Sequence, residues 1–229
     1  MSFAVDPPPV VSLPVTGSDR RFPVQNLFCV GRNYADHAVE MGGDPNREPP
    51  FFFIKPAWAI LGDGGVMEYP AFSDDVHHEV ELVVAIGKGG RNIAPEDAMD
   101  HVFGYAVGID MTRRDLQQQA KDTSRPWEAG KSFVHAAPCS DVCRAAEAGD
   151  VNEAGITLSI NGETRQDGRV NQMIWKIPEV IVRLSELFAL QPGDLIFTGT
   201  PAGVGPIERG DRITASVDGV GQLNIEVAA

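Results

Sequence analysis

Three carboxylates stand at positions where together they could bind a divalent cation. Glu79 and Glu81 are two residues apart at the start of an apolar run that extends to Ile86. In a β-strand, side chains two residues apart point to the same face. Two carboxylates side by side on a buried strand repel one another and lose hydration, and a cation would relieve both effects. Asp110, alone at the end of a second apolar run, could supply a third oxygen ligand.

An all-oxygen ligand set suits Mg²⁺, and Mn²⁺ or Ca²⁺ could take its place. The alternative is that Glu79 and Glu81 lie on a solvated edge and bind nothing. His77 and His78, directly upstream, could be further ligands, or they could lie beside the site or on the surface.

A second pair of residues could activate water. His37 and Glu40 are three positions apart on a short helix predicted over residues 34–41, so they share one helix face. A carboxylate beside a histidine orients the ring and raises its basicity. Such pairs are also common on exposed helices, so the spacing alone leaves a solvated ion pair open.

Two further segments could contact an anion. Lys131 lies in a turn of small residues, and the loop at residues 198–201 (TGTP) offers hydroxyls and backbone N–H groups at a strand end. A solvated lysine and an ordinary Gly/Pro turn are the alternatives.

The elements that must position these residues are mostly short strands. Apolar runs predict strands over residues 27–30, 51–54, 80–86, 102–109, 156–160 and 195–197, and a strand pair within 212–227. Asn161-Gly162 predicts a type I′ hairpin. Helices are predicted over 113–121 and, with one apolar stripe, over 178–190. This pattern indicates an α+β, mostly β fold with a few short helices.

Composition narrows the possible functions of the chain. Its 229 residues carry a formal net charge of −13. An acidic protein lacks the clustered Lys and Arg that contact phosphates, so we expect no nucleic-acid partner. An anionic substrate would need local positive charge or a metal.

The compartment is expected to be the cytoplasm. The three cysteines, Cys29, Cys139 and Cys143, fit neither a disulfide framework nor a zinc site. The first residues lack the pattern of a signal peptide, and no apolar stretch is long enough to span a membrane, so no membrane partner is expected.

Several segments, in their order along the chain, resemble the motifs of the fumarylacetoacetate hydrolase superfamily. The ordered set of motifs is specific and covers the chain from about Asn26 onward. The matching stretches are residues 29–37 (CVGRNYADH), 53–56 (FIKP), 77–82 (HHEVEL), 104–115 (GYAVGIDMTRRD), 131–133 (KSF) and 198–205 (TGTPAGVG).

The resemblance implies a fold and a site. The fold would be a mixed β-roll or β-sandwich-like catalytic domain over residues 21–229, preceded by an extended arm over residues 1–20, in a homodimer. Family roles matched by position imply the following set: Glu79, Glu81 and Asp110 as ligands of Mg²⁺ or Mn²⁺; His37 and Glu40 as the general-base pair on a segment that often closes over ligand; Lys131 as the enolate-stabilising lysine; and Arg32, Arg114, Gln117 and Thr200 as substrate contacts.

The resemblance also implies an activity. Residues 21–24 and 47–53 are similar to fumarylpyruvate hydrolases of aromatic-compound catabolism, within the short, bacterial-type branch. We therefore expect hydrolysis of a C–C bond in a small anionic 2,4-dioxo acid, an acylpyruvate such as 3-fumarylpyruvate, giving fumarate and pyruvate. Decarboxylation of oxaloacetate is one alternative. Hydration or isomerisation of a 2-oxo-dienoate is another, and a non-catalytic metal-binding module is a third.

Overall fold

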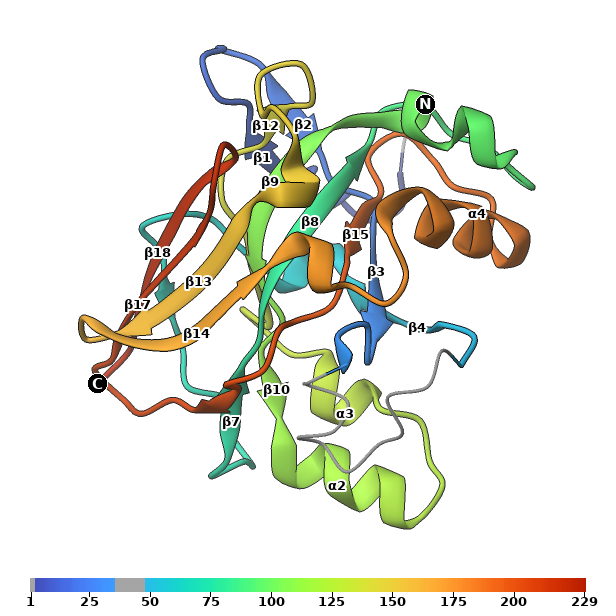
Figure 1. The fold of residues 1–229 in the computed structure, drawn as a ribbon. Helices are drawn as coiled ribbons and strands as arrows, with labels where there is room; N and C mark the ends of the chain where they lie inside the picture. Colours follow the sequence, from blue (N-terminus) through green and yellow to red (C-terminus); the bar gives the residue numbers. More distant parts are fainter. Residues whose placement is uncertain (1–2, 36–47) are drawn as a thin grey trace.

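Within residues 3–35 and 48–229, which the computed structural model describes, a six-stranded sheet and a five-stranded sheet form the centre of the fold (Figure 1). In order across the larger sheet, the strands are β12 (Cys143–Arg144), β9 (Val102–Ile109), β8 (Val80–Ile86), β15 (Leu195–Phe197), β3 (Asn26–Gly31) and β4 (Phe51–Pro56). In order across the smaller sheet, they are β14 (Glu163–Arg169), β13 (Gly155–Ile160), β17 (Arg212–Val217), β18 (Gly221–Val227) and β6 (Val66–Met67).

Shorter elements connect and cover these sheets. The remaining strands are β1 (Ser12–Pro14), β2 (Arg21–Pro23), β5 (Ile60–Leu61), β7 (Val76–His78), β10 (Thr112–Arg113), β11 (Ala137–Pro138) and β16 (Gly205–Pro206). Within the described residues, the α-helices of more than one residue are α2 (Arg114–Asp122), α3 (Glu128–Lys131) and α4 (Ile177–Leu187). Single turns of 3-10 helix are η1 (Ala57–Ala59), η3 (Val151–Glu153) and η4 (Val170–Gln172), and η2 (Pro95–His101) is longer.

The core lies between the two sheets. Strands β13, β17 and β18 of the smaller sheet contact β8 and β9 of the larger one. Strand β8 is buried along its whole length, which explains its continuous apolar sequence. Strands β13, β17 and β18 bury every second residue, as expected for strands with one face in the core and one in solvent.

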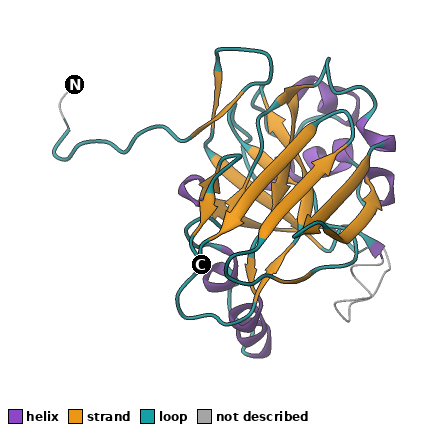
Figure 2. Ribbon diagram, turned by 90° about the vertical axis from the view of Figure 1, so that its left-hand side faces the viewer, coloured by secondary structure: helices purple, strands orange, loops and turns teal. Residues whose placement is uncertain are grey.

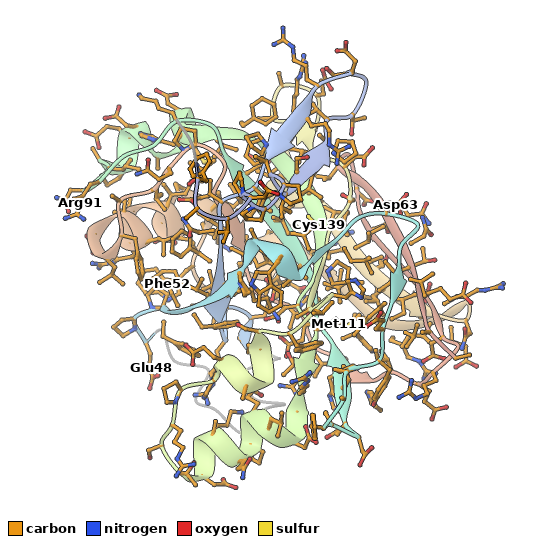
Figure 3. All side chains as sticks on the ribbon, turned by 180° about the vertical axis from the view of Figure 1, so that it is seen from behind. Glu48, Phe52, Asp63, Arg91, Met111 and Cys139 are labelled. Carbon is orange, nitrogen blue, oxygen red and sulfur yellow. The ribbon has the colours of Figure 1, made fainter. Side chains whose placement is uncertain are left out.

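The strand directions bring several chain segments to one end of the larger sheet. Strand β15 runs parallel to β3 and antiparallel to β8, and β8 runs antiparallel to β9. The carboxyl ends of β3, β9 and β15 therefore meet the amino end of β8. Helices α2 and α3 lie below this end of the sheet in Figure 1. In Figure 3, Met111, which directly follows Asp110, lies in the interior above these two helices.

The structure confirms the predicted fold class and most of the predicted elements. The hairpin turn at Asn161-Gly162 has positive φ at both residues, as a type I′ turn requires. Helix α4 is shorter than predicted and ends at Leu187, because Phe188 already has extended backbone angles. Strand β4, expected to be buried, is an edge strand on which Phe51 and Ile54 are exposed.

The N-terminal residues that the structure describes leave the body of the protein. They run as an extended loop up to β1, which pairs with β2 (Figure 2). The division at residue 20 into an arm and a catalytic domain stays a prediction.

Two expectations about the whole chain can be compared with the structure. All three cysteines are buried and form no disulfide, and burial raises the pKa of the Cys29 thiol. Across the residues that the structure describes, no helix has the length and apolar character needed to cross a bilayer.

Candidate metal centre

Glu79, Glu81 and Asp110 lie together at the end of the larger sheet. Glu79 links β7 to β8, Glu81 is the second residue of β8, and Asp110 directly follows β9. The pairing of β8 with β9 sets Glu79 opposite Asp110, whose backbone N–H donates to the Glu79 carbonyl oxygen at 2.8 Å. One carboxylate oxygen from each residue lies within 4.8 Å of the others.

The three carboxylates are buried, so they do not lie on a solvated edge. Their exposed fractions are 5% for Glu79, 2% for Glu81 and 1% for Asp110. Burial, and then the charges of Asp110 and Glu79, raise the pKa of Glu81 well above its usual value. An ionised Glu81 is therefore unfavourable here unless further positive charge lies close to it.

Lys131 lies among these carboxylates at the end of helix α3. Its ammonium donates to Glu79 Oε2 at 2.8 Å, to Asp110 Oδ2 at 2.7 Å and to Thr112 Oγ1 at 2.6 Å. Burial alone would lower the pKa of Lys131, but the charges of Asp110 and Glu79 raise it above its usual value. The lysine is thus a fixed ammonium group and not a solvated side chain.

A second buried lysine was not predicted as a site residue. Lys55 on β4 is 0% exposed, and its ammonium lies 2.8 Å from Asp110 Oδ1. It also donates to the backbone carbonyl oxygens of Met111, at 2.9 Å, and of Lys131. The signal in the sequence is a lysine inside the apolar run of residues 51–56, where a charge needs a buried partner.

Arg114 and Gln117, two of the predicted substrate-binding residues, are hydrogen-bonded to one another. The Arg114 guanidinium donates to Glu79 Oε1 at 2.6 Å and to Gln117 Oε1 at 2.8 Å. Both residues lie on helix α2, so this helix reaches the acidic cluster through Arg114.

The three carboxylates line one cavity together with Lys131, Arg114 and Gln117. Its wall also includes Arg32 after β3, Thr200 after β15, and the side chains of Phe51, Phe53, Lys121 and Trp127. The ring of Phe51 packs edge-on against Trp127 with centroids 5.2 Å apart. The cavity therefore combines an acidic cluster, several cations and an aromatic wall.

The histidines before the cluster have other partners. His77 Nε2 lies 2.8 Å from Asp75 Oδ1, and His78 Nδ1 lies 2.9 Å from Gln166 Oε1. Within the described part of the chain, the potential metal-binding group consists of the three carboxylates. His37 and Glu40 lie outside the described residues, so their predicted pairing stays a prediction.

A divalent cation fits the donor set of this cluster. Glu81 Oε2 accepts from the Gly199 backbone N–H at 2.8 Å, but no cationic side chain in the described ranges lies within 4 Å of it. Asp110 Oδ1 is buried and pairs with the Lys55 ammonium at 2.8 Å, but this contact lacks the geometry of a hydrogen bond. Buried carboxylate oxygens with unused lone pairs are what Mg²⁺ and Mn²⁺ bind.

Comparison with known proteins gives the family. Residues 26–228 match the family described as fumarylacetoacetate (FAA) hydrolase C-terminal. A crystal structure of fumarylpyruvate hydrolase from Pseudomonas aeruginosa, in complex with Mn²⁺ and pyruvate, is 49% identical to this chain. The match covers 99% of each chain with a TM-score of 0.97.

Other relatives carry different names. The mitochondrial oxaloacetate tautomerase of Mus musculus is 43% identical over 203 residues, 89% of this chain and 91% of the relative. A mitochondrial oxaloacetate decarboxylase of Dictyostelium discoideum is 43% identical over 197 residues, 86% of this chain and 90% of the relative.

Proposed function

We propose a specific activity for this chain, which belongs to the fumarylacetoacetate hydrolase family. It is a divalent-metal-dependent hydrolase that cleaves the C3–C4 bond of an acylpyruvate, with 3-fumarylpyruvate as the substrate and fumarate and pyruvate as the products. The observation that carries this proposal is the similarity, over 99% of both chains, to a fumarylpyruvate hydrolase whose structure holds Mn²⁺ and pyruvate.

Glu79, Glu81 and Asp110 would hold the cation, which is Mg²⁺ or Mn²⁺. When bound, the cation supplies a Lewis acid for the 2-oxo acid end of the substrate. It also adds positive charge beside Glu81, which forms no ion pair within 4 Å among the described residues. This charge is how a protein of net charge −13 can accept an anionic substrate.

Lys131 stabilises negative charge during the reaction. It stays protonated because Asp110 and Glu79 hold its pKa above the usual value. Its ammonium is fixed in the cavity wall, where its three N–H groups bond to Glu79, Asp110 and Thr112. It can therefore stabilise, as a fixed positive charge, the oxygen on which enolate charge develops. Lys55 positions this group, since its ammonium bonds the backbone carbonyl oxygen of Lys131 and pairs with Asp110.

His37 and Glu40 are proposed as the general-base pair. Glu40 orients His37, which removes a proton from water. The hydroxide adds to the C4 carbonyl, and the C3–C4 bond breaks to release fumarate and the enolate of pyruvate. General-base catalysis typically contributes about 10²- to 10⁴-fold to the rate.

Oxaloacetate tautomerisation is the second candidate, favoured by the 43% identity to the mouse tautomerase. Tautomerisation moves a proton between carbon and oxygen and cleaves no C–C bond. Decarboxylation would instead release CO₂. Oxaloacetate, like 3-fumarylpyruvate, is a 2-oxo acid, so the same cavity could hold either of them.

The products separate these candidates. Purified protein with Mn²⁺ is supplied with 3-fumarylpyruvate, other acylpyruvates, a 2-oxo-dienoate or oxaloacetate, and the products are identified by chromatography. The proposal predicts equimolar fumarate and pyruvate from 3-fumarylpyruvate, with a higher kcat/KM than for any conversion of oxaloacetate. Rapid ketonisation of oxaloacetate with no cleavage of acylpyruvates would favour the tautomerase instead.

A further inference from the structure

Gln166 is a buried polar residue that the proposed mechanism does not use. It lies on β14, at the edge of the smaller sheet, and is the one buried residue of that strand. Its side chain is 0% exposed, and its amide reaches across to the end of the larger sheet where the carboxylates gather. A buried side-chain amide is normally fully hydrogen-bonded. Its hydrogen-bond partners therefore identify the groups that it holds in place.

Four hydrogen bonds fix the Gln166 amide in one orientation. Its Oε1 accepts from the Val80 backbone N–H at 3.0 Å and lies 2.9 Å from His78 Nδ1. Its Nε2 donates to the Pro201 carbonyl oxygen at 2.9 Å and to Thr200 Oγ1 at 2.8 Å. A backbone N–H can only donate and a backbone carbonyl can only accept, so the amide cannot be reversed.

This orientation determines how the Thr200 hydroxyl can be used. Because Gln166 Nε2 donates to it, Thr200 Oγ1 accepts, and the hydroxyl proton must point to a different acceptor. No other hydrogen-bond partner of Thr200 Oγ1 is found among the residues that the structure describes. Thr200 is 2% exposed and lines the cavity of the acidic cluster, so its hydroxyl proton is available to an acceptor on a molecule bound there.

We infer that Gln166 is a positioning residue that holds the Thr200 hydroxyl as a donor toward a carboxylate oxygen of the bound 2-oxo acid. The inference rests on the proposed function and deepens it. A carboxylate offers only lone pairs at this point, whereas the N–H group of an amide would meet the hydroxyl proton. The Gln166–Thr200 pair therefore presents a donor to an acceptor oxygen of the bound acid.

If Gln166 only stabilised the fold, its replacement would affect metal binding as well as pyruvate binding. Its Oε1 also bonds the backbone of Val80, between Glu79 and Glu81, so a loss of shape would disturb metal binding. The inference instead requires that Gln166 act through the Thr200 hydroxyl.

The experiment measures binding of pyruvate to the full-length, Mn²⁺-loaded protein by calorimetry. Gln166→Glu keeps the side-chain shape and the acceptor for Val80, and it is measured at a pH at which the new carboxyl is ionised. Its second oxygen then cannot donate, so the Thr200 hydroxyl turns toward it. We expect the Kd for pyruvate to rise roughly 10- to 100-fold, the effect of losing one hydrogen bond to a charged group. The affinity for Mn²⁺, measured by electron paramagnetic resonance, should stay unchanged.

Variants of Thr200 make the test independent of how Gln166→Glu folds. Thr200→Val removes the hydroxyl and should weaken pyruvate binding as much as Gln166→Glu does, while Thr200→Ser should bind like the wild-type protein. Adding Gln166→Glu to Thr200→Val should cause no further loss, because the two changes act on one hydrogen bond. Gln222→Glu, an exposed glutamine on β18, is the matched control and should bind pyruvate normally.

Each result has a distinct meaning. If Thr200→Val or Gln166→Glu binds pyruvate as tightly as the wild-type protein, the inference is wrong and the proposed function stands. Additive losses in the double variant would also overturn it, because Gln166 would then act by another route. If the wild-type Mn²⁺ protein binds no pyruvate, the proposed function fails, and the inference fails with it.

Discussion

Glu81 differs from the other two carboxylates in its neighbours. Glu79 pairs with Arg114 and Lys131, and Asp110 pairs with Lys131 and Lys55. Glu81 accepts one backbone N–H, from Gly199, and its pKa is raised by burial and by the other carboxylates. A bound cation would therefore stabilise Glu81 more than either neighbour.

This difference predicts the behaviour of Glu81→Gln. The glutamine keeps an acceptor for the Gly199 N–H but removes one negative metal ligand. We expect the affinity for Mn²⁺ to fall by more than the roughly 10- to 100-fold that follows loss of an outer partner of a ligand. The thermal midpoint in EDTA should not fall, because the variant no longer buries this carboxylate. Glu163→Gln, in a surface pair with Arg165, is the control, and metal binding at wild-type affinity by Glu81→Gln would contradict the proposed ligand set.

The His37 prediction depends on the sequence alone. His37→Ala should lower the rate of 3-fumarylpyruvate hydrolysis by about 10²-fold or more, the scale of losing a general base. Its affinity for Mn²⁺ should barely change, since His37 is not a proposed ligand. Decarboxylation of oxaloacetate, if the protein catalyses it, should fall much less because it needs no activated water. Hydrolysis by His37→Ala at a near wild-type rate would remove the water-activation role.

Spacing along the chain predicted the acidic cluster but not the residues that support it. Glu79 and Glu81 can be recognised in the sequence, because two carboxylates stand two residues apart at the start of an apolar run. Lys55 and Gln166 act through partners far away in sequence, such as Lys131 for the first and Val80 for the second. Such pairings follow from strand order, which local patterns do not contain.

The loop after β15 depends on a glycine with a crowded, left-handed backbone. Gly199 has φ of 99°, and a Cβ there would lie 2.7 Å from Asn33 Cβ. Its N–H also donates to Glu81, and Thr200 follows it directly. The Asn33 side chain is itself held by the backbones of Trp175 and Thr198, so it has little room to move away.

Gly199→Ala should therefore damage the site, and Gly162→Ala should not. Gly162 also has positive φ, in the β13–β14 turn, but a Cβ there meets nothing within 4 Å. We expect Gly162→Ala to cost about 1–2 kcal/mol of unfolding free energy, the penalty for a left-handed residue, with normal pyruvate binding. Gly199→Ala should lose more stability and also weaken pyruvate binding, as measured by denaturant unfolding and calorimetry. Equal effects of the two substitutions would contradict the role given to this loop.

Elements with strong local signals were predicted well. The continuous apolar run of β8 and the Asn161-Gly162 turn each have one favourable structure. The order of strands in the sheets was not predicted, because β15 inserts between β3 and β8 from a distant part of the chain. That insertion brings Thr200 to the acidic cluster, so the complete cavity could not be derived from spacing.

Association of the whole chain stays a prediction from the family resemblance. We expect a homodimer, with a mass about twice the 24.7 kDa of the chain, by light scattering at micromolar concentration. Exposed apolar side chains such as Trp58, Phe72 and Val134 are candidates for burial in such an interface. A monomer under these conditions would contradict this expectation, and it would leave the site unchanged.

The central claim is that this protein cleaves an acylpyruvate only when a divalent cation is bound. The most direct measurement follows release of fumarate and pyruvate from 3-fumarylpyruvate by one preparation before EDTA treatment, after removal of metal and EDTA, and after addition of Mn²⁺ or Mg²⁺. The account predicts equimolar products, loss of activity on metal removal, and recovery with either ion, but no recovery in Glu81→Gln at the same ion concentration. Full cleavage activity after complete metal removal, or no cleavage with metal present, would contradict it.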